Sequence, residues 1–166
     1  MKNLKLLFVI QAMCISVMTL KSQVAEFKVG SNVYLVDEKN KTIINKGNTV
    51  YQSYLQKCTY FSTKDDVDLF YPSVKKSFPE KMIKSFAKTK GKFFINVFCD
   101  SSGEIKEVYF LVKNIEISSE VISSINTFER LIKQDKINLS TNCEDQIYYR
   151  LTFVLRFNNL NSCNDE

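Results

Sequence analysis

The chain has 166 residues, of which 45% are hydrophobic and 25% are charged, and it contains neither histidine nor tryptophan. This length allows one domain with a substantial core, and the lack of histidine removes the usual general base and the commonest metal ligand. The net charge of +5 falls to about +2 beyond residue 23, because the first 23 residues hold three lysines and no acid. That value is too close to neutral to favour a nucleic acid as partner.

The N-terminal segment has the pattern of a secretory signal peptide. Two lysines precede a largely apolar run of fifteen residues, Leu6 to Leu20, and a third lysine closes it. Fifteen residues are short for a membrane span, which needs about 20, but they suit the apolar part of a signal peptide. We therefore predict a signal peptide over residues 1–23, cleaved near Ser22 and Gln23, and a periplasmic or secreted protein without a membrane span. An uncleaved anchor and a buried helix are the alternatives.

Residues 24–77 are expected to form an N-terminal β-hairpin and a connecting segment. Short β-type runs at 26–30 and 33–36 precede a polar turn, and residues 42–45 supply a returning strand. The segment 49–60 fits both helical spacing and a tyrosine-rich strand, so its structure stays undecided.

Residues 78–166 hold the predicted core and end in a polar tail. Ser77 and Glu80 have capping-box spacing at the start of a leading helix, and Gly91 is expected to end that helix in the left-handed conformation. The strand at 92–99 is apolar on both faces, which predicts a central position in the sheet. The remaining elements are a strand at 105–113, an amphipathic helix at 119–134 capped by Ser118 or Ser119, and a strand at 146–157 whose odd-numbered residues face the core.

These elements predict an α+β fold. Its centre is a three-stranded antiparallel sheet in the order strand, strand, helix, strand (ββαβ). The leading helix, the packed amphipathic helix and the N-terminal β-hairpin are added to that centre. Only two prolines and four glycines occur, and no linker marks a second domain.

Four cysteines follow the predicted signal peptide. An even number in an exported chain predicts two disulfides, for which three pairings exist. No two of them form a C-x-x-C motif, so the spacing does not favour a metal or redox site. Free buried thiols are the alternative. The cysteines are Cys58, Cys99, Cys143 and Cys163.

The sequence contains no recognisable catalytic constellation. A serine triad needs histidine, which is absent. A carboxylate pair for acid–base chemistry would draw on acidic residues in turns or on polar strand faces, and we expect these residues to be solvated instead. The acidic loop at 64–68 lacks the glycine and the distal glutamate of an EF-hand. We therefore predict no metal site, and in the absence of a catalytic constellation we predict no enzyme activity and no cofactor. The acidic residues considered are Asp65, Asp66, Asp68, Glu104 and Glu107.

Tyr148, Arg150 and Arg156 share the predicted outer face of the last strand. Two interpretations fit them, a cation–π or ligand-binding patch and an ordinary polar covering of the sheet. We expect the polar covering.

The stretch from Phe78 to Phe157 resembles the C-terminal domain of TonB, the energy-transducing protein of Gram-negative envelopes. Residues 79–86, Pro-x-x-Met-Ile-x-x-Phe, are similar to the leading helix of that family, and residues 91–108 are similar to its glycine-bounded hairpin, with the turn Asp-Ser-Ser-Gly. The closing aromatic strand matches as well. Because the chain has no proline-rich spacer, the resemblance implies a stand-alone exported domain and not energy transduction.

The resemblance also implies a disulfide pairing. In such a fold the last strand lies antiparallel to the first strand of the core, so Cys143 approaches Cys99. Cys163 then approaches the segment that carries Cys58. The implied disulfides are Cys99–Cys143 and Cys58–Cys163, each stabilising the fold by about 3–4 kcal/mol.

These observations predict a non-enzymatic envelope protein that binds another protein as an adaptor. A small sheet leaves a strand edge, and addition of a partner strand is a common mode of recognition. The alternative for this edge is that the hairpin at 26–45 covers it. The alternative function is a secreted inhibitor or a host-facing effector, which would be found in the medium and not in the envelope.

Overall fold

The computed structural model of the protein describes residues 24–50, 59–61, 69–137 and 148–161. The strands are β1 (Val24–Val29), β2 (Asn32–Asp37), β3 (Thr42–Asn45), β4 (Thr59–Phe61), β5 (Lys92–Asp100), β6 (Ile105–Lys113) and β7 (Tyr148–Arg156). The helices are α3 (Tyr71–Ser77), α4 (Glu80–Lys88), α5 (Ser119–Ile132) and the 3₁₀ helix η2 (Phe157–Asn161).

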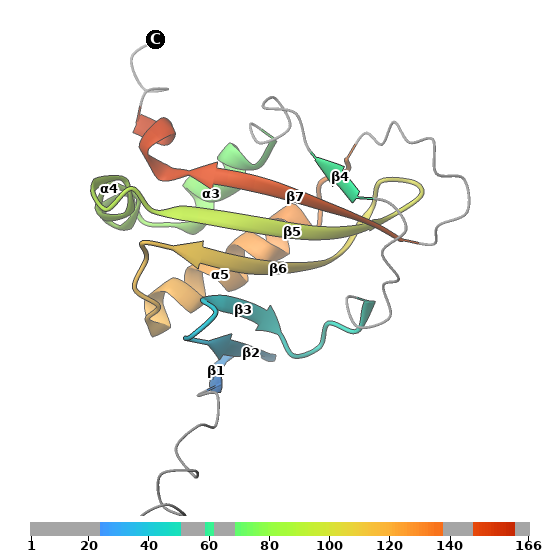
Figure 1. Ribbon diagram of the computed structural model, residues 1–166, viewed down its shortest axis with the longest axis horizontal. Coiled ribbons are helices and arrows are strands. Elements are labelled where there is room, and N and C mark those ends of the chain that lie inside the picture. Colours follow the sequence, from blue (N-terminus) through green and yellow to red (C-terminus); the bar gives the residue numbers. More distant parts are fainter. Residues whose placement is uncertain (1–23, 51–58, 62–68, 138–147, 162–166) are drawn as a thin grey trace, which may run out of the picture.

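The described strands form one sheet in the order β1-β2-β3-β6-β5-β7-β4, with α3 and α5 behind it in Figure 1. Six strands pair antiparallel, and the short β4 runs parallel to β7. The predicted α+β class is confirmed, but the prediction of a three-stranded sheet is wrong. Strands β6, β5 and β7 with α5 form the predicted centre, and further strands extend it on both sides.

The N-terminal hairpin enlarges the sheet because β3 pairs with β6. Ile43 lies opposite Phe110 in this pairing, and both side chains are buried on the helix-covered face. Burial of one such isoleucine contributes about 2 kcal/mol, so the hairpin is held by the same core as the later strands. The edge of β6 is therefore covered by the hairpin, which was the alternative considered for it, and the sheet edge moves out to β1.

The helix-covered face follows the predicted period of two. In the central strand β5, Phe93, Ile95, Val97 and Cys99 are fully buried. In β7 the odd-numbered residues are buried as predicted, and β7 lies antiparallel to β5, with Tyr148 opposite Asp100. The central position of β5 is thus confirmed, since β6 and β7 flank it.

Phe78 connects the elements at one end of the core. Its ring centroid lies between 5.5 and 6.3 Å from those of four other phenylalanines, and all four pairs are edge-to-face. Such pairs contribute about 0.5–1.5 kcal/mol each beyond their buried area. They join the α3–α4 connection to β5, α5 and η2. The four partners are Phe86, Phe93, Phe128 and Phe157.

The predicted capping box is wrong because a helix not seen in the sequence precedes it. Ser77 is the last residue of α3, and its hydroxyl donates to the Ser73 carbonyl at 2.6 Å instead of capping α4. Helix α4 begins at Glu80, behind Pro79, without a side-chain cap. In α5, by contrast, the expected cap is present, since Ser118 accepts a hydrogen bond from the Val121 amide at 3.3 Å.

Two further expectations near the helix ends need correction. The left-handed residue after α4 is Lys90, with φ of 56°, and not Gly91. Gly91 is needed for space, because a Cβ there would lie 2.9 Å from the Ile115 Cγ1 atom. The tail after β7 is not uniformly polar in structure, since it begins with η2 and buries Leu160.

None of the helices in the described residues is long and apolar enough to cross a membrane.

Candidate functional site

The face of the sheet opposite α3 and α5 is the open face, which is turned toward the viewer in Figure 1. The register places alternate residues of β6, β5 and β7 side by side, so rows of side chains cross the three strands on this face. The row nearest the β5–β6 turn holds Glu107, Phe98 and Arg150, and three further rows follow it. The basic row is Lys113, Lys92 and Arg156; the apolar row is Leu111, Phe94 and Val154; the polar row is Tyr109, Asn96 and Thr152.

The basic row places three cations in direct opposition. Lys92 lies opposite Lys113 on one side and opposite Arg156 on the other. Lys113 and Arg156 are exposed and Lys92 is half-buried. Within the described residues none of the three forms an ion pair. Like charges directly opposite in a sheet are destabilising, so the stability of the fold does not explain this row.

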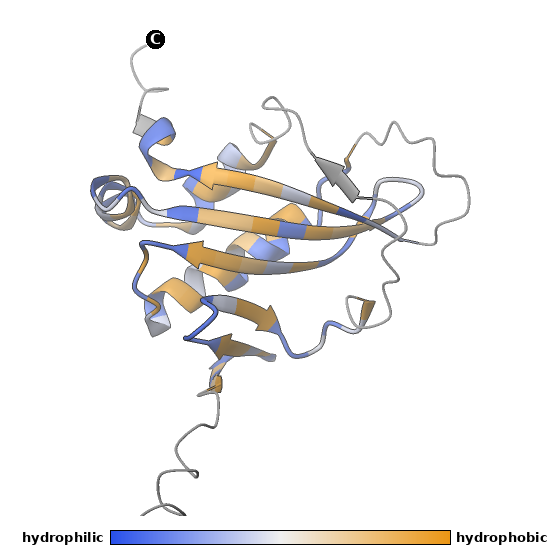
Figure 2. Cartoon of the chain, in the orientation of Figure 1, coloured by the Kyte–Doolittle hydropathy of each residue, from blue (hydrophilic) through white to orange (hydrophobic). Residues whose placement is uncertain are grey.

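The apolar row lies two residues along each strand from the basic row. Phe94 is opposite both Leu111 and Val154. Leu111 is 37% exposed, and the other two side chains are half-buried. In Figure 2 the hydrophobic colour covers most of the middle strands, because residues of both faces contribute to it. Among the described residues, the open face therefore combines positive charges that lack an ion-pair partner with accessible apolar surface.

The side chains of the polar row make their polar contacts within the sheet. Asn96 Oδ1 accepts hydrogen bonds from Arg150 Nη2 at 3.0 Å and from Thr152 Oγ1 at 2.8 Å. The Arg150 guanidinium also lies 5.6 Å from the ring centroid of Tyr109, within cation–π range. Burial raises the pKa of Tyr109, and the nearby Arg150 charge offsets part of that rise.

The three residues considered as one patch on the last strand therefore separate. Arg150 makes its cation–π contact inside the sheet, with Tyr109. Arg156 lies six residues further along β7, about 20 Å away in an extended strand, and belongs to the basic row. Tyr148 is half-buried at the start of the strand. Arg150 therefore makes the cation–π contact that was the alternative to a polar covering, whereas Arg156 is exposed in the basic row.

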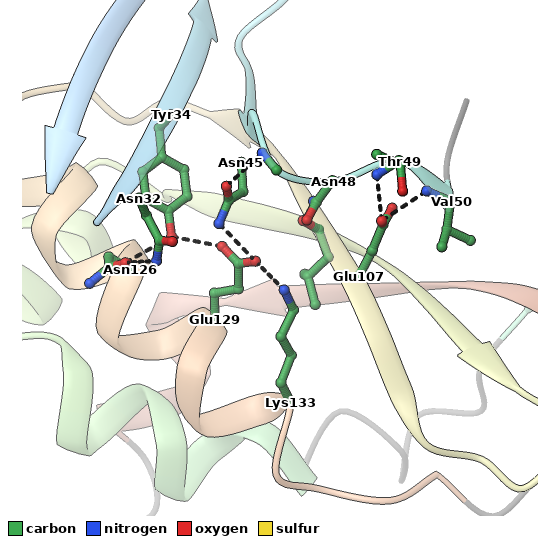
Figure 3. A network of polar contacts seen from close by, with 12 residues as sticks. Asn32, Tyr34, Asn45, Asn48, Thr49, Val50, Glu107, Asn126, Glu129 and Lys133 are labelled. Atoms are coloured by element: carbon green, nitrogen blue, oxygen red, sulfur yellow. Dashed lines mark hydrogen bonds and ion pairs between the residues drawn. The ribbon is translucent and has the colours of Figure 1, made fainter. Parts of the chain in front are cut away.

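Glu107 is not the solvated carboxylate that its strand position predicts. Its side chain is buried at 6% exposure, and Oε1 accepts hydrogen bonds from the backbone amides of Thr49 and Val50, the latter at 2.8 Å. The segment after β3 is thus attached to β6 at this end of the sheet (Figure 3). Glu104 is exposed, as predicted, and forms an ion pair with Lys106. Asp65, Asp66 and Asp68 lie outside the described residues.

A second buried carboxylate, Glu129, lies between α5 and the N-terminal strands (Figure 3). Its Oε2 atom accepts from the Tyr34 hydroxyl at 2.7 Å, and Oε1 accepts from Lys133 Nζ at 2.6 Å and from Asn45 Nδ2 at 3.5 Å. A carboxylate with these partners is fixed in place. It therefore anchors the hairpin to α5, a structural role that differs from acid–base chemistry.

Sequence reasoning missed Glu129, although its spacing contains a signal. It follows Ile125 by four residues and precedes Ile132 by three, so it lies on the apolar stripe of α5. A carboxylate at such a position requires buried partners. Tyr34 supplies one, and burial, followed by the Glu129 charge and hydrogen bond, raises the pKa of Tyr34. The tyrosine thus stays protonated as the donor.

The Cys99 side chain is buried among the core side chains of β5, and its sulfur lies 3.7 Å from the Tyr149 carbonyl oxygen. Burial, and secondarily the Asp100 charge, raises the pKa of this thiol to about 12. Cys58, Cys143 and Cys163 lie outside the described residues. The pairings Cys99–Cys143 and Cys58–Cys163 therefore stay predictions.

The raised pKa of Cys99 predicts a loss of stability at alkaline pH. In the unfolded chain the thiol ionises near its ordinary value of 9.0, whereas in the fold it keeps its proton to about pH 12. The stabilisation is therefore complete below pH 9 and disappears between these values. We expect urea unfolding of the reduced protein to give a steeper alkaline decline for the wild type than for Cys99→Ala. Parallel profiles would contradict this expectation.

Among the described residues no group of histidine, cysteine, aspartate and glutamate side chains is arranged to hold a metal ion. No protein-family model matches the chain. A search of curated proteins found no match either.

The fold has a counterpart among solved structures. A DUF5043 family protein from Bacteroides uniformis ATCC 8492 is similar, with a TM-score of 0.55 and 17% sequence identity, over 81% of this chain and 90% of that chain. At this identity the similarity concerns the fold alone. Nothing in the comparisons tests the resemblance to the TonB C-terminal domain, which stays a prediction.

Proposed function

We propose that this protein is an exported, non-enzymatic binding domain whose open face binds an acidic and partly apolar segment of another protein. The basic row carries this proposal. Lys92, Lys113 and Arg156 stand in direct opposition without a neutralising partner among the described residues. An anionic partner would neutralise these charges and relieve their mutual repulsion, so binding of such a partner would be favourable.

The neighbouring apolar row supports a protein ligand. Successive strands lie about 5 Å apart and alternate residues of one strand about 7 Å apart, so the two rows run side by side across the sheet. An extended segment with carboxylates on one side and apolar side chains on the other fits both rows at once. Apolar contact with Leu111 and Phe94 would add area to the charge attraction, and such a combination gives specificity as well as a fast encounter.

A binding function also fits the state of the buried carboxylates. Glu107 and Glu129 are each engaged by several donors, which leaves neither positioned to take a proton from a substrate. The sequence holds no histidine to replace them. We propose export by the N-terminal signal segment, to the periplasm or beyond.

The proposal predicts that reversing the basic row weakens the binding of an acidic peptide. The probe is a fluorescent peptide in which glutamate and leucine alternate, followed by anisotropy at low and high salt. We expect the triple variant Lys92→Glu, Lys113→Glu, Arg156→Glu to bind at least about tenfold more weakly than the wild type. The matched control reverses three exposed lysines on other elements. Those are Lys81, Lys88 and Lys136, and the control should retain wild-type affinity.

Two outcomes would overturn the binding proposal. Equal affinity of the two triple variants would show that the basic row is not the site. Tighter binding of an oligonucleotide or of anionic vesicles than of the peptide would assign the row to another class of ligand.

The N-terminus of the exported protein, determined by mass spectrometry, tests cleavage near Ser22 and Gln23. Recovery from the medium instead of the envelope would favour the alternative of a secreted inhibitor or effector.

A further inference from the structure

The outer edge of the sheet is formed by β1, at the lower side of the sheet in Figure 1. The Lys46 amide donates to the Val33 carbonyl at 2.7 Å, so the backbone groups of Val33 point toward β3. The backbone groups of successive residues point to opposite sides of a strand. The amide and carbonyl groups of Tyr34 therefore point toward β1, where Phe27 lies opposite Tyr34. It follows that the amide and carbonyl groups of Glu26 and Lys28 point away from the sheet.

The side chains of β1 alternate as cleanly as its backbone. Ala25, Phe27 and Val29 are half-buried and pack against the core on the helix-covered face. Glu26 and Lys28 are exposed on the open face. Glu26 forms an exposed ion pair with Lys46 at 3.0 Å, and Lys28 forms none within the described residues. The edge thus offers hydrogen-bonding groups, apolar contacts and one charge of each sign.

We propose that two copies of this chain pair antiparallel through β1. Two-fold symmetry and the outward direction of Glu26 and Lys28 leave three central registers, centred on residue 26, 27 or 28. The register centred on residue 26 places the two Glu26 side chains opposite each other, and the register centred on residue 28 does the same with the two Lys28 side chains. Like charges directly opposite are unfavourable. The register centred on Phe27 places each Glu26 opposite the Lys28 of the other copy, so charge complementarity selects it.

The same register completes the apolar side of the edge. Phe27 stands opposite the Phe27 of the second copy, at the close spacing of a non-hydrogen-bonded pair, about 4.5 Å between Cα atoms. Ala25 stands opposite Val29. These side chains are already half-buried against the core and α5, and a second strand covers the part that remains exposed.

The two-fold axis of such a pair is perpendicular to the sheet. Both copies therefore turn their helices to one side and their open faces to the other, in one continuous sheet. The dimer presents two basic rows on the same surface. A partner with two acidic segments would gain avidity from this arrangement, but the pairing itself does not depend on the proposed ligand.

Charge exchange provides the test. In Glu26→Lys the two copies oppose lysine to lysine, and in Lys28→Glu they oppose glutamate to glutamate. We expect each single variant of the full chain to self-associate about tenfold more weakly than the wild type, because two attractive pairs become repulsive. A mixture of the two variants restores complementary pairs at both positions. Native mass spectrometry with one variant isotope-labelled should find mixed dimers in excess over either homodimer.

The mixture separates β1 pairing from other causes. A folding defect would not be rescued by mixing, and association through the apolar N-terminal segment would not respond to either charge. Amide hydrogen exchange of Glu26 and Lys28 should also slow as protein concentration rises. A monomer at every concentration would overturn the proposal, and would mean that the charges protect the edge from pairing. Association without preference for mixed dimers would overturn it as well.

Discussion

Replacing Gly103 by alanine is expected to destabilise the protein by about 3–5 kcal/mol, because two costs combine at this position. The backbone of Gly103 has φ of +83°, a left-handed conformation that residues with a Cβ rarely adopt. A Cβ atom there would also lie 1.9 Å from the Ile137 carbonyl oxygen, which is far inside contact distance. The obstacle is backbone, so no side-chain rotation relieves it.

The close approach at Gly103 joins two distant segments. The Gly103 carbonyl accepts from the Ile137 amide at 2.9 Å, and a bridge between Glu104 and Lys136 follows it. The turn between β5 and β6 is thereby attached to the segment that follows α5. The substitution therefore separates elements that hold the buried Ile137 in the core, in addition to straining the turn.

Gly30 provides the matched control for this prediction. It also has a positive φ, of +61°, but a Cβ atom there would meet nothing within 4 Å. Gly30→Ala should therefore show only the conformational cost, about 1 kcal/mol. Urea unfolding of the wild type and both variants measures the difference. Equal losses for the two variants would mean that the contact with Ile137 contributes nothing.

The turn that contains Gly103 was predictable because its chemistry is local. Asp100 lies two residues before Ser102, and its carboxylate accepts from the Ser102 amide at 2.9 Å, which is the usual role of aspartate at the start of a turn. The same holds for the α5 cap at Ser118 and for the alternation in β7. Each of these features is encoded within a few neighbouring residues.

The size of the sheet was not predictable in this way. Periodicity identified the strands of the hairpin, but β3 reaches β6 through a pairing between residues more than sixty positions apart. A strand pattern says which face is apolar and not which strand lies beside it. Helix α3 was missed for a related reason, since its short sequence Tyr-Pro-Ser-Val-Lys-Lys-Ser has little apolar periodicity and depends on the core for stability.

The candidate site depends on register even more strongly. Lys92, Lys113 and Arg156 are unremarkable as single residues, and only the pairing of β5 with both neighbours brings the three charges together. Arg150 was recognisable as a residue of the outer face, but its contact with Tyr109 requires the same pairing. Register is fixed by long-range packing, so a single sequence predicts the faces and not the rows.

Glu129→Ala is the second substitution with a large expected effect, a loss of about 3 kcal/mol. Removing one member of a buried charged network usually costs about 3–5 kcal/mol, and the lower end applies because Lys133 is partly exposed and can turn to solvent. Tyr34 cannot turn to solvent, because its side chain is fully buried. Its hydroxyl donates to Glu129 at 2.7 Å, and the substitution leaves it only the longer contact with Asn126 Oδ1 at 3.2 Å. Urea unfolding at neutral pH measures the loss.

A double-mutant cycle with Tyr34→Phe identifies the interaction that carries this loss. Tyr34→Phe alone should cost about 1–2 kcal/mol, because Glu129 keeps Lys133 and Asn45 as partners. If the hydroxyl and the carboxylate stabilise each other, the double variant loses less than the sum of the single losses, by about 1 kcal/mol or more. Additive losses would place the stabilisation in the Lys133 contact instead. Because Tyr34 belongs to β2 and Glu129 to α5, strong coupling would show that this contact stabilises the attachment of the N-terminal strands to the later core.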